Sequence, residues 1–151
     1  MRVYLDNCSY NRPFDDQTQI RIALEAHAKL YIQRLITEKK LELVVSYVSR
    51  FENNANPYVS KRNPINLFFQ NATIYLDSSH SVSVDTRAAE IMKHKIKTND
   101  ALHISCAIET GCDYFITTDD EILHYKTADI KICNPITFLP MIEYGIMKHR
   151  I

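Results

Sequence analysis

Residues 2–6, RVYLD, form a short apolar run that ends on an aspartate, Asp6. The length and apolar character of this run predict a buried strand. Residues 17–40 follow with apolar side chains at helical spacing, so we expect the strand to lead into a long helix. A strand followed by a helix is the repeating unit of a parallel sheet, in which Asp6 would stand at the carboxyl end of the first strand.

The same alternation continues along the rest of the chain. Further strands are predicted at residues 42–48, 72–77, 113–119 and 129–133. Helical patterns occupy residues 49–56, 65–71, 83–95, 98–111, 120–125 and 134–145. Continuous apolar strands separated by helices predict an α/β fold with a mostly parallel sheet of about five strands, flanked by helices in three layers.

Several residues are expected to mark the ends of these helices. Thr98 or Asn99 is predicted to cap the helix at 98–111, and Gly111 to close it. Asn63 and Pro64, followed by residues 65–71, are expected to form a short helix, and Pro135 is placed near the first turn of the last helix.

Composition limits the function classes. The chain has 151 residues and 46% hydrophobic residues, enough for a single domain that spans residues 1–151. Lys+Arg and Asp+Glu both number 18, so overall charge does not indicate a nucleic-acid binder. Neither of the two glycines follows the first strand, which argues against a nucleotide-phosphate loop.

The expected environment is a reducing cytoplasm. The four cysteines form no C-x-x-C pair and are predicted to be free thiols. The N-terminus has no apolar segment typical of a secretory signal, and no apolar run is long enough to cross a membrane. We therefore expect a cytoplasmic protein with no membrane association.

Four carboxylates are predicted to meet at one edge of the sheet. Asp6 and Asp119 each end a predicted strand, where α/β folds place their active crevice. Asp100 lies in the first turn of a predicted helix, and Glu52 lies in the helix after the second strand. Gathered carboxylates repel one another unless a cation neutralises them, and an all-oxygen site favours Mg²⁺ or Mn²⁺ over Zn²⁺.

Taken singly, each of these residues also has a structural explanation. Asp6 could serve as a turn or cap residue, Asp100 as a partner of the helix dipole, and Glu52 as a solvated carboxylate. Asp120 competes with Asp119 for the site, and we interpret Asp120 as the N-cap of the helix at 120–125. His103, one turn after Asp100, is interpreted as packing on the helix face.

Four motifs in this order carry a resemblance to a known family. The segments VYLDNC, SRFEN, KTNDALHISCA and YFITTDDEIL resemble the PIN domains, and NPITFLPMI near the C-terminus also fits. Within that family the chain is most similar to the VapC-like ribonuclease toxins of type II toxin–antitoxin pairs. In such proteins the corresponding acidic residues form a metal-binding catalytic quartet, which here is Asp6, Glu52, Asp100 and Asp119.

The resemblance implies a function and partners. It implies an endoribonuclease with one or two Mg²⁺ or Mn²⁺ ions, RNA as substrate, an antitoxin partner and a homodimer. Asn7 and Thr117 correspond to polar positions that orient ligands or water in the family. The polar loop NRPFDD, residues 11–16, departs from the family pattern, so substrate contacts cannot be transferred there.

Basic residues suggest where RNA would bind. Residues 53–76 contain no carboxylate but include Lys61 and Arg62 together with aromatic residues, so they could form an RNA-facing rim. Phe68 and Phe69 could equally belong to the core. Lys97 ends a second basic cluster just before Asp100 and could contact phosphate, or could lie on a solvated helix face.

Two alternatives stay open at this point. A degenerate PIN-like module would bind RNA or protein without catalysis, although all four candidate carboxylates are present. A haloacid-dehalogenase-like phosphatase would use Asp6 as a nucleophile, but it needs a second aspartate two residues later, where the chain has Cys8.

Overall fold

The computed structural model describes residues 1–149 and contains one sheet of five strands. The strands are β1 (Arg2–Leu5), β2 (Glu42–Ser46), β3 (Ile74–Leu76), β4 (Tyr114–Ile116) and β5 (Lys131–Cys133). Their order is β3-β2-β1-β4-β5, and every neighbouring pair is parallel. The predicted α/β fold with a parallel sheet is therefore confirmed.

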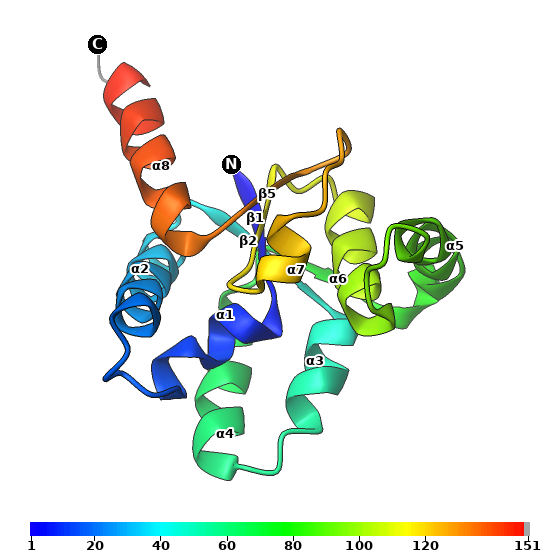
Figure 1. Cartoon of the computed structure of the whole chain (residues 1–151), viewed down its shortest axis with the longest axis horizontal. Helices are drawn as coiled ribbons and strands as arrows, with labels where there is room; N and C mark the ends of the chain where they lie inside the picture. The colour runs from blue at the N-terminus through cyan, green and yellow to red at the C-terminus, as the bar shows by residue number, and fades with distance from the viewer. Residues whose placement is uncertain (150–151) are drawn as a thin grey trace.

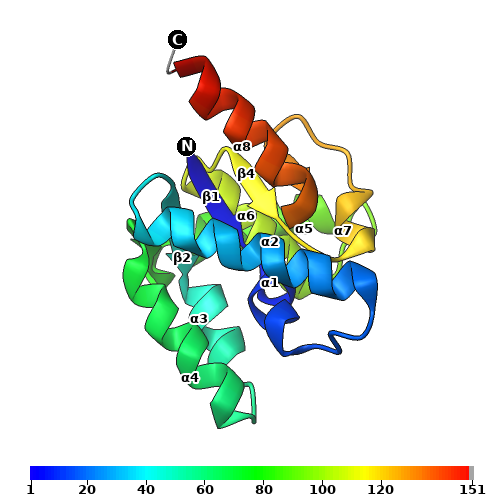
Figure 2. The same ribbon diagram turned by 90° about the vertical axis from the view of Figure 1, so that its left-hand side faces the viewer.

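Helices connect the strands and cover both faces of the sheet. They are α1 (Asn7–Asn11), α2 (Ile20–Thr37), α3 (Tyr47–Asn54), α4 (Val59–Phe68), α5 (Ser81–Met92), α6 (Thr98–Glu109), α7 (Asp120–Leu123) and α8 (Pro135–His149). Figure 1 shows α2 and α8 on one side of the strands and α5 and α6 on the other. Figure 2, turned by 90°, shows α2 running across the front of the sheet, with α3 and α4 side by side beyond its edge.

Successive side chains of β1 point to opposite faces of the sheet and pack into two separate hydrophobic cores. Val3 and Leu5 face the cluster that includes Ile32 of α2 and Phe138 of α8. Tyr4 faces the opposite cluster, which includes Ile104 of α6. Because successive strand residues point to opposite faces, Val3, Tyr4 and Leu5 contact helices on opposite sides of the sheet.

Some predicted helix boundaries are wrong. Helix α4 begins at Val59 rather than at Pro64, which lies inside the helix and removes only a single backbone donor. Lys97, not Thr98 or Asn99, takes the N-cap position of α6 and makes no side-chain cap bond. Gly111 does close α6, since it has a φ of 70°, a conformation that residues with a Cβ rarely adopt.

Among the described helices, none has both the length and the hydrophobicity needed to cross a membrane.

Candidate active site

The sheet topology places a crevice at the carboxyl ends of β1 and β4. From β1 the chain moves outward through β2 and β3, then returns to the other side of β1 to form β4 and β5. Ligand sites of open α/β sheets lie where the strand order reverses in this way. Asp6 follows β1 and Thr117 follows β4, so two predicted site residues lie at this crevice.

Asp6 is held rigidly. Its side chain is 3% exposed and caps α1, with Oδ1 accepting a hydrogen bond of 2.9 Å from the backbone N–H of Ser9. Oδ2 accepts a hydrogen bond from the Thr117 hydroxyl. Burial raises the pKa of Asp6 to about 6, although the hydrogen bonds from Thr117 and Ser9 oppose this shift. Asp6 therefore keeps its proton to a higher pH than an exposed aspartate does.

Thr117 also connects Asp6 to Asp119. The Thr117 Oγ1 accepts a 3.0 Å hydrogen bond from the backbone N–H of Asp119. The Asp119 side chain is the N-cap of α7 and accepts a 2.9 Å hydrogen bond from the Glu121 N–H. The interpretation of Asp120 as this cap is therefore wrong. Asp120 is the first helical residue and pairs with Arg21 at 2.7 Å.

The remaining two carboxylates come from helices. Asp100 lies in the first turn of α6 and is half-buried. Burial raises the pKa of Asp100, and the charges of Asp119 and Glu52 add to this effect. Glu52, in α3, is 37% exposed, and its Oε2 forms a hydrogen bond with Nε2 of His103. Repulsion therefore reaches Asp100 from two other members of the predicted quartet.

The Cys8 thiol lies within reach of the charges of all four carboxylates. Partial burial raises the pKa of this surface-reaching thiol, and the charges of the four carboxylates raise it further, to about 12. The contributors are Asp6, Asp119, Asp100 and Glu52. Because Coulomb effects fall with distance, the four segments that carry these residues lie around one point.

The four carboxylates offer the oxygen ligands that a hard divalent cation prefers. All four side chains offer oxygen, and the raised pKa of Asp100 reflects repulsion that a cation would relieve. Within the part of the chain that is described, no three carboxylate, imidazole or thiol side chains are arranged as a ready metal site. Asp6, Glu52 and Asp119 each direct an oxygen at a protein donor, and each carboxylate keeps lone pairs that a cation could use.

A recess of about 520 Å³ opens beside these carboxylates. Its lining includes Glu52 and Asp119 together with four asparagines, Asn7, Asn11, Asn53 and Asn56. Asn7 Oδ1 and Asn53 Oδ1 are buried and have no hydrogen-bond partner among the described residues. The predicted polar residue Asn7 therefore has a free acceptor next to the acidic site.

The three predicted RNA-binding residues make different contacts around the recess. Lys97 is exposed at the N-cap of α6, and its Nζ lies 3.9 Å from a carboxylate oxygen of Glu121. Arg62 Nη1 donates a 3.1 Å hydrogen bond to the carbonyl of Asn56 in the recess. Lys61 Nζ lies 4.8 Å from the ring centroid of the exposed Tyr58. Phe69 belongs to the core.

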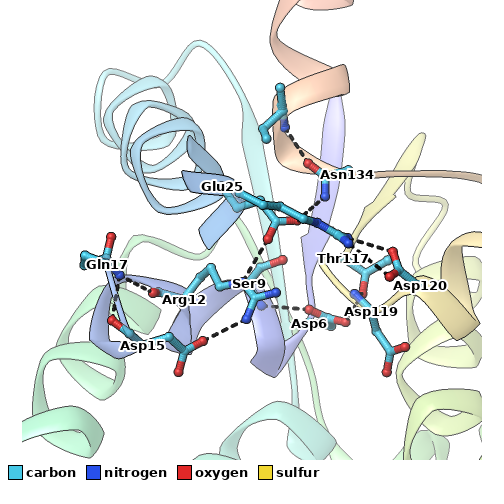
Figure 3. A network of polar contacts seen from close by, with 12 residues as sticks. Asp6, Ser9, Arg12, Asp15, Gln17, Glu25, Thr117, Asp119, Asp120 and Asn134 are labelled. Carbon is cyan, nitrogen blue, oxygen red and sulfur yellow. Dashed lines mark hydrogen bonds and ion pairs between the residues drawn. The ribbon is translucent and has the colours of Figure 1, made fainter. Parts of the chain in front are cut away.

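Figure 3 shows a second polar network that sequence reasoning missed. Glu25 of α2 is fully buried and accepts hydrogen bonds from Arg12 Nε at 2.9 Å and from Asn134 Nδ2. Arg12 also pairs with Asp15 at 3.0 Å. The network ties the polar loop after α1 to α2 and to the start of α8, which fixes one wall of the recess.

His103 is the other residue whose role was missed. It is 2% exposed and contacts Glu52 directly, rather than only packing on the helix face. A signal was present in the sequence, because a histidine three positions after Asp100 lies on the same face of the helix.

Comparison with known proteins agrees with this fold. The family model of the PIN domain matches residues 15–128. The structure is similar to that of VapBC2 from Rickettsia felis bound to a DNA fragment from its promoter, with 14% identity, a TM-score of 0.55, and coverage of 89% of this chain and 98% of the other. It is also similar to VapBC-1 from nontypeable Haemophilus influenzae, with 17% identity, a TM-score of 0.50 and the same coverage. No curated protein matches the chain.

Proposed function

The chain belongs to the PIN domain family, and we propose that it is a metal-dependent endoribonuclease that hydrolyses RNA phosphodiester bonds. The observation that carries the proposal is that Asp6 and Asp119 share the Thr117 hydroxyl beside a recess lined by Glu52 and Asp119, with Asp100 near enough for the charges of Asp119 and Glu52 to raise its pKa. The family match spans Glu52, Asp100 and Asp119, while Asp6 lies before it. Asp6 is supported by its position at the crevice and by its contact with Thr117.

Asp6, Glu52, Asp100 and Asp119 would hold one or two Mg²⁺ or Mn²⁺ ions. A bound ion of this kind supplies Lewis-acid chemistry and neutralises phosphate charge. The protein's part is to keep the carboxylates in place. Thr117 and the Ser9 N–H fix Asp6, and the free acceptor of Asn7 can orient a water or a ligand beside it.

The recess next to the carboxylates would receive the RNA strand. Its asparagines offer amide donors and acceptors that suit the edges of unpaired bases. Lys97 stands next to Asp100, and Lys61 and Arg62 lie at the start of α4, where they would contact phosphates. This arrangement favours single-stranded or looped RNA as the substrate class.

Cleavage of labelled structured RNA tests the proposal. We expect the purified protein to cleave with Mn²⁺ or Mg²⁺, to lose cleavage in excess EDTA, and to lose it in Asp100→Asn. Asp129→Asn is the matched control, because Asp129 is an exposed carboxylate outside the quartet. Equal cleavage by wild type and Asp100→Asn would expose a contaminant and contradict the assignment.

We further propose that the protein is the toxin of a toxin–antitoxin pair, acting in the cytoplasm as a homodimer. The support is the similarity in fold to two VapBC structures and the VapC-like motifs. Induced expression of the wild type should arrest the growth of a bacterial host, whereas Asp100→Asn should not. Normal growth with the wild type, at equal expression of folded protein, would contradict the toxin role. A scaffold or binding module without catalysis would give that result.

A further inference from the structure

A buried chain of hydrogen bonds leads from the sheet to Glu52. The Tyr4 hydroxyl lies 2.7 Å from Ser46 Oγ, 2.8 Å from Ser49 Oγ and 2.6 Å from His103 Nδ1. The other ring nitrogen of His103, Nε2, forms a hydrogen bond with Glu52 Oε2. The chain thus ends on a carboxylate of the proposed quartet.

The members of this chain come from different elements and are sealed from water. Tyr4 belongs to β1, Ser46 ends β2, Ser49 belongs to α3 and His103 to α6. Each of the four is at most 2% exposed. The Tyr4 ring stacks on Phe115 at 5.5 Å between centroids and meets the His103 ring edge-on at 5.7 Å. The imidazole is therefore fixed by packing as well as by hydrogen bonds.

The hydrogen-bonding capacities give the chain a direction. An ionised carboxylate only accepts hydrogen bonds, so His103 Nε2 must carry a hydrogen and donate it to Glu52. In a neutral imidazole Nδ1 is then an acceptor, and the Tyr4 hydroxyl donates a hydrogen bond to it. The Tyr4 oxygen can in turn accept from the hydroxyls of Ser46 and Ser49. Every polar group has a compatible partner in this arrangement.

We propose that His103 is a positioning residue that fixes the Glu52 carboxylate in the active site. It holds Oε2 from the buried side, which leaves Oε1 available to the proposed metal site. Outer contacts of this kind set the orientation of metal-binding carboxylates in proteins. The inference rests on the proposed function for what Glu52 binds, but the hydrogen bond itself does not depend on it.

The contact between His103 and Glu52 is hard to explain by packing alone. Glu52 is 37% exposed on α3, and a carboxylate there would be fully solvated if nothing restrained it. A core position that needed only volume could be filled by leucine without a buried polar chain. Four polar side chains buried together contribute to function or specificity more readily than to stability.

The first experiment measures Mn²⁺ affinity by titration calorimetry in the full-length protein. The amide nitrogen of His103→Gln can stand near the position of Nε2 and donate to Glu52, whereas the shorter amide of His103→Asn reaches only the Nδ1 side. We expect His103→Asn to weaken Mn²⁺ binding about 10-fold, and His103→Gln to recover most of it. Wild-type affinity in a folded His103→Asn would overturn the inference.

Thermal unfolding separates positioning from simple loss of structure. Both variants replace the ring, so both should lower the melting temperature by similar amounts, while only His103→Asn lowers metal affinity. Equal losses of affinity in the two variants, following their losses of stability, would show a purely structural role and overturn the inference.

A second measurement needs no metal. The ¹⁵N chemical shifts of the His103 ring in the metal-free protein should show a single tautomer with the hydrogen on Nε2, and Glu52→Ala should change this state. A wild-type ring with hydrogen on Nδ1 and none on Nε2 would overturn the inference. Wild-type protein that has the Nε2–H tautomer but neither binds Mn²⁺ nor cleaves RNA would support the hydrogen-bond chain and reject the proposed function.

Discussion

The Thr117 hydroxyl donates a hydrogen bond to the Asp6 carboxylate across the carboxyl ends of β4 and β1, the two strands at which the sheet order reverses. The same oxygen accepts from the backbone N–H of Asp119 at 3.0 Å. One hydroxyl thus sets the distance between two of the four proposed metal-binding residues. The consequences of this contact can be tested.

Replacing Thr117 should impair cleavage without removing a carboxylate. Thr117→Val keeps the shape of the buried side chain but removes both the donor to Asp6 and the acceptor for Asp119. We expect a loss of about 10- to 100-fold in cleavage rate, whereas Thr117→Ser should retain most of the activity. Single-turnover cleavage assays measure this, and equal rates in Thr117→Val and wild type would show that the contact is not needed.

Asp6 should make stability depend on pH in the metal-free protein. Its pKa is raised to about 6 from the 3.8 of an unperturbed aspartate, so between these pH values the folded state binds more protons than the unfolded state. Stability attributable to Asp6 is therefore present at low pH and lost as the pH rises from about 4 to 6. Asp6→Asn should remove this fall and raise the free energy of unfolding at pH 7 by about 1–3 kcal/mol.

Urea unfolding at several pH values, in EDTA, checks the Asp6 prediction. The fall in stability between pH 4 and 6 should be smaller in Asp6→Asn than in the wild type. Parallel pH profiles for the two proteins would mean that Asp6 titrates normally in the folded state.

Substitutions of the neighbours Asp119 and Asp120 should have very different effects on RNA cleavage. Asp119 faces the crevice as the cap of α7, whereas Asp120 pairs with Arg21 on the outside (Figure 3). Asp119→Asn should reduce cleavage by about 100-fold or more. Asp120→Asn should keep cleavage and cost at most about 1 kcal/mol in stability, because its ion pair is largely exposed. The opposite ranking would move the site to Asp120.

Lys29 should destabilise the fold at neutral and acidic pH. Its side chain is 3% exposed, with Nζ 5.3 Å from the ring centroid of Tyr10, and burial lowers the pKa of Lys29 to about 7. From pH 7 to about pH 10 the unfolded state binds more protons, so stability rises with pH across this window. Lys29→Met should raise stability at pH 7 by at least about 1 kcal/mol.

Thermal unfolding from pH 6 to pH 10 measures the effect of Lys29. The advantage of Lys29→Met over the wild type should shrink as the pH rises toward 10. A constant difference between the two proteins would mean that Lys29 keeps an ordinary pKa in the folded state.

The sequence predicted correctly those features that depend on a short local pattern. Continuous apolar runs such as RVYLD and ELVVSYV, separated by helical patterns, predicted a parallel sheet, and the strand ends predicted that Asp6 and Asp119 would lie at one edge. The start of α4 was predicted wrongly because Pro64 lies inside the helix, where it removes only one backbone hydrogen-bond donor.

Long-range polar contacts were beyond the reach of local patterns. The partners of Glu52 and Glu25 are separated from them by 51 and by as many as 109 positions in the sequence. The spacing of His103 after Asp100 placed the imidazole on the helix face of the site, but no local pattern identified Glu52 as its partner, or Asn134 as the partner of Glu25. Such pairs follow from how α3 and α6, or α2 and α8, pack on the sheet.

In the proposed function, the four carboxylates act together in RNA cleavage. The most direct measurement is the single-turnover rate of RNA cleavage with Mn²⁺ for Asp6→Asn, Glu52→Gln, Asp100→Asn and Asp119→Asn, beside wild type and Asp129→Asn. We predict that each of the four variants loses about 100-fold or more while the Asp129→Asn control keeps the wild-type rate. Wild-type cleavage by a folded Asp6→Asn or Asp100→Asn would contradict the account.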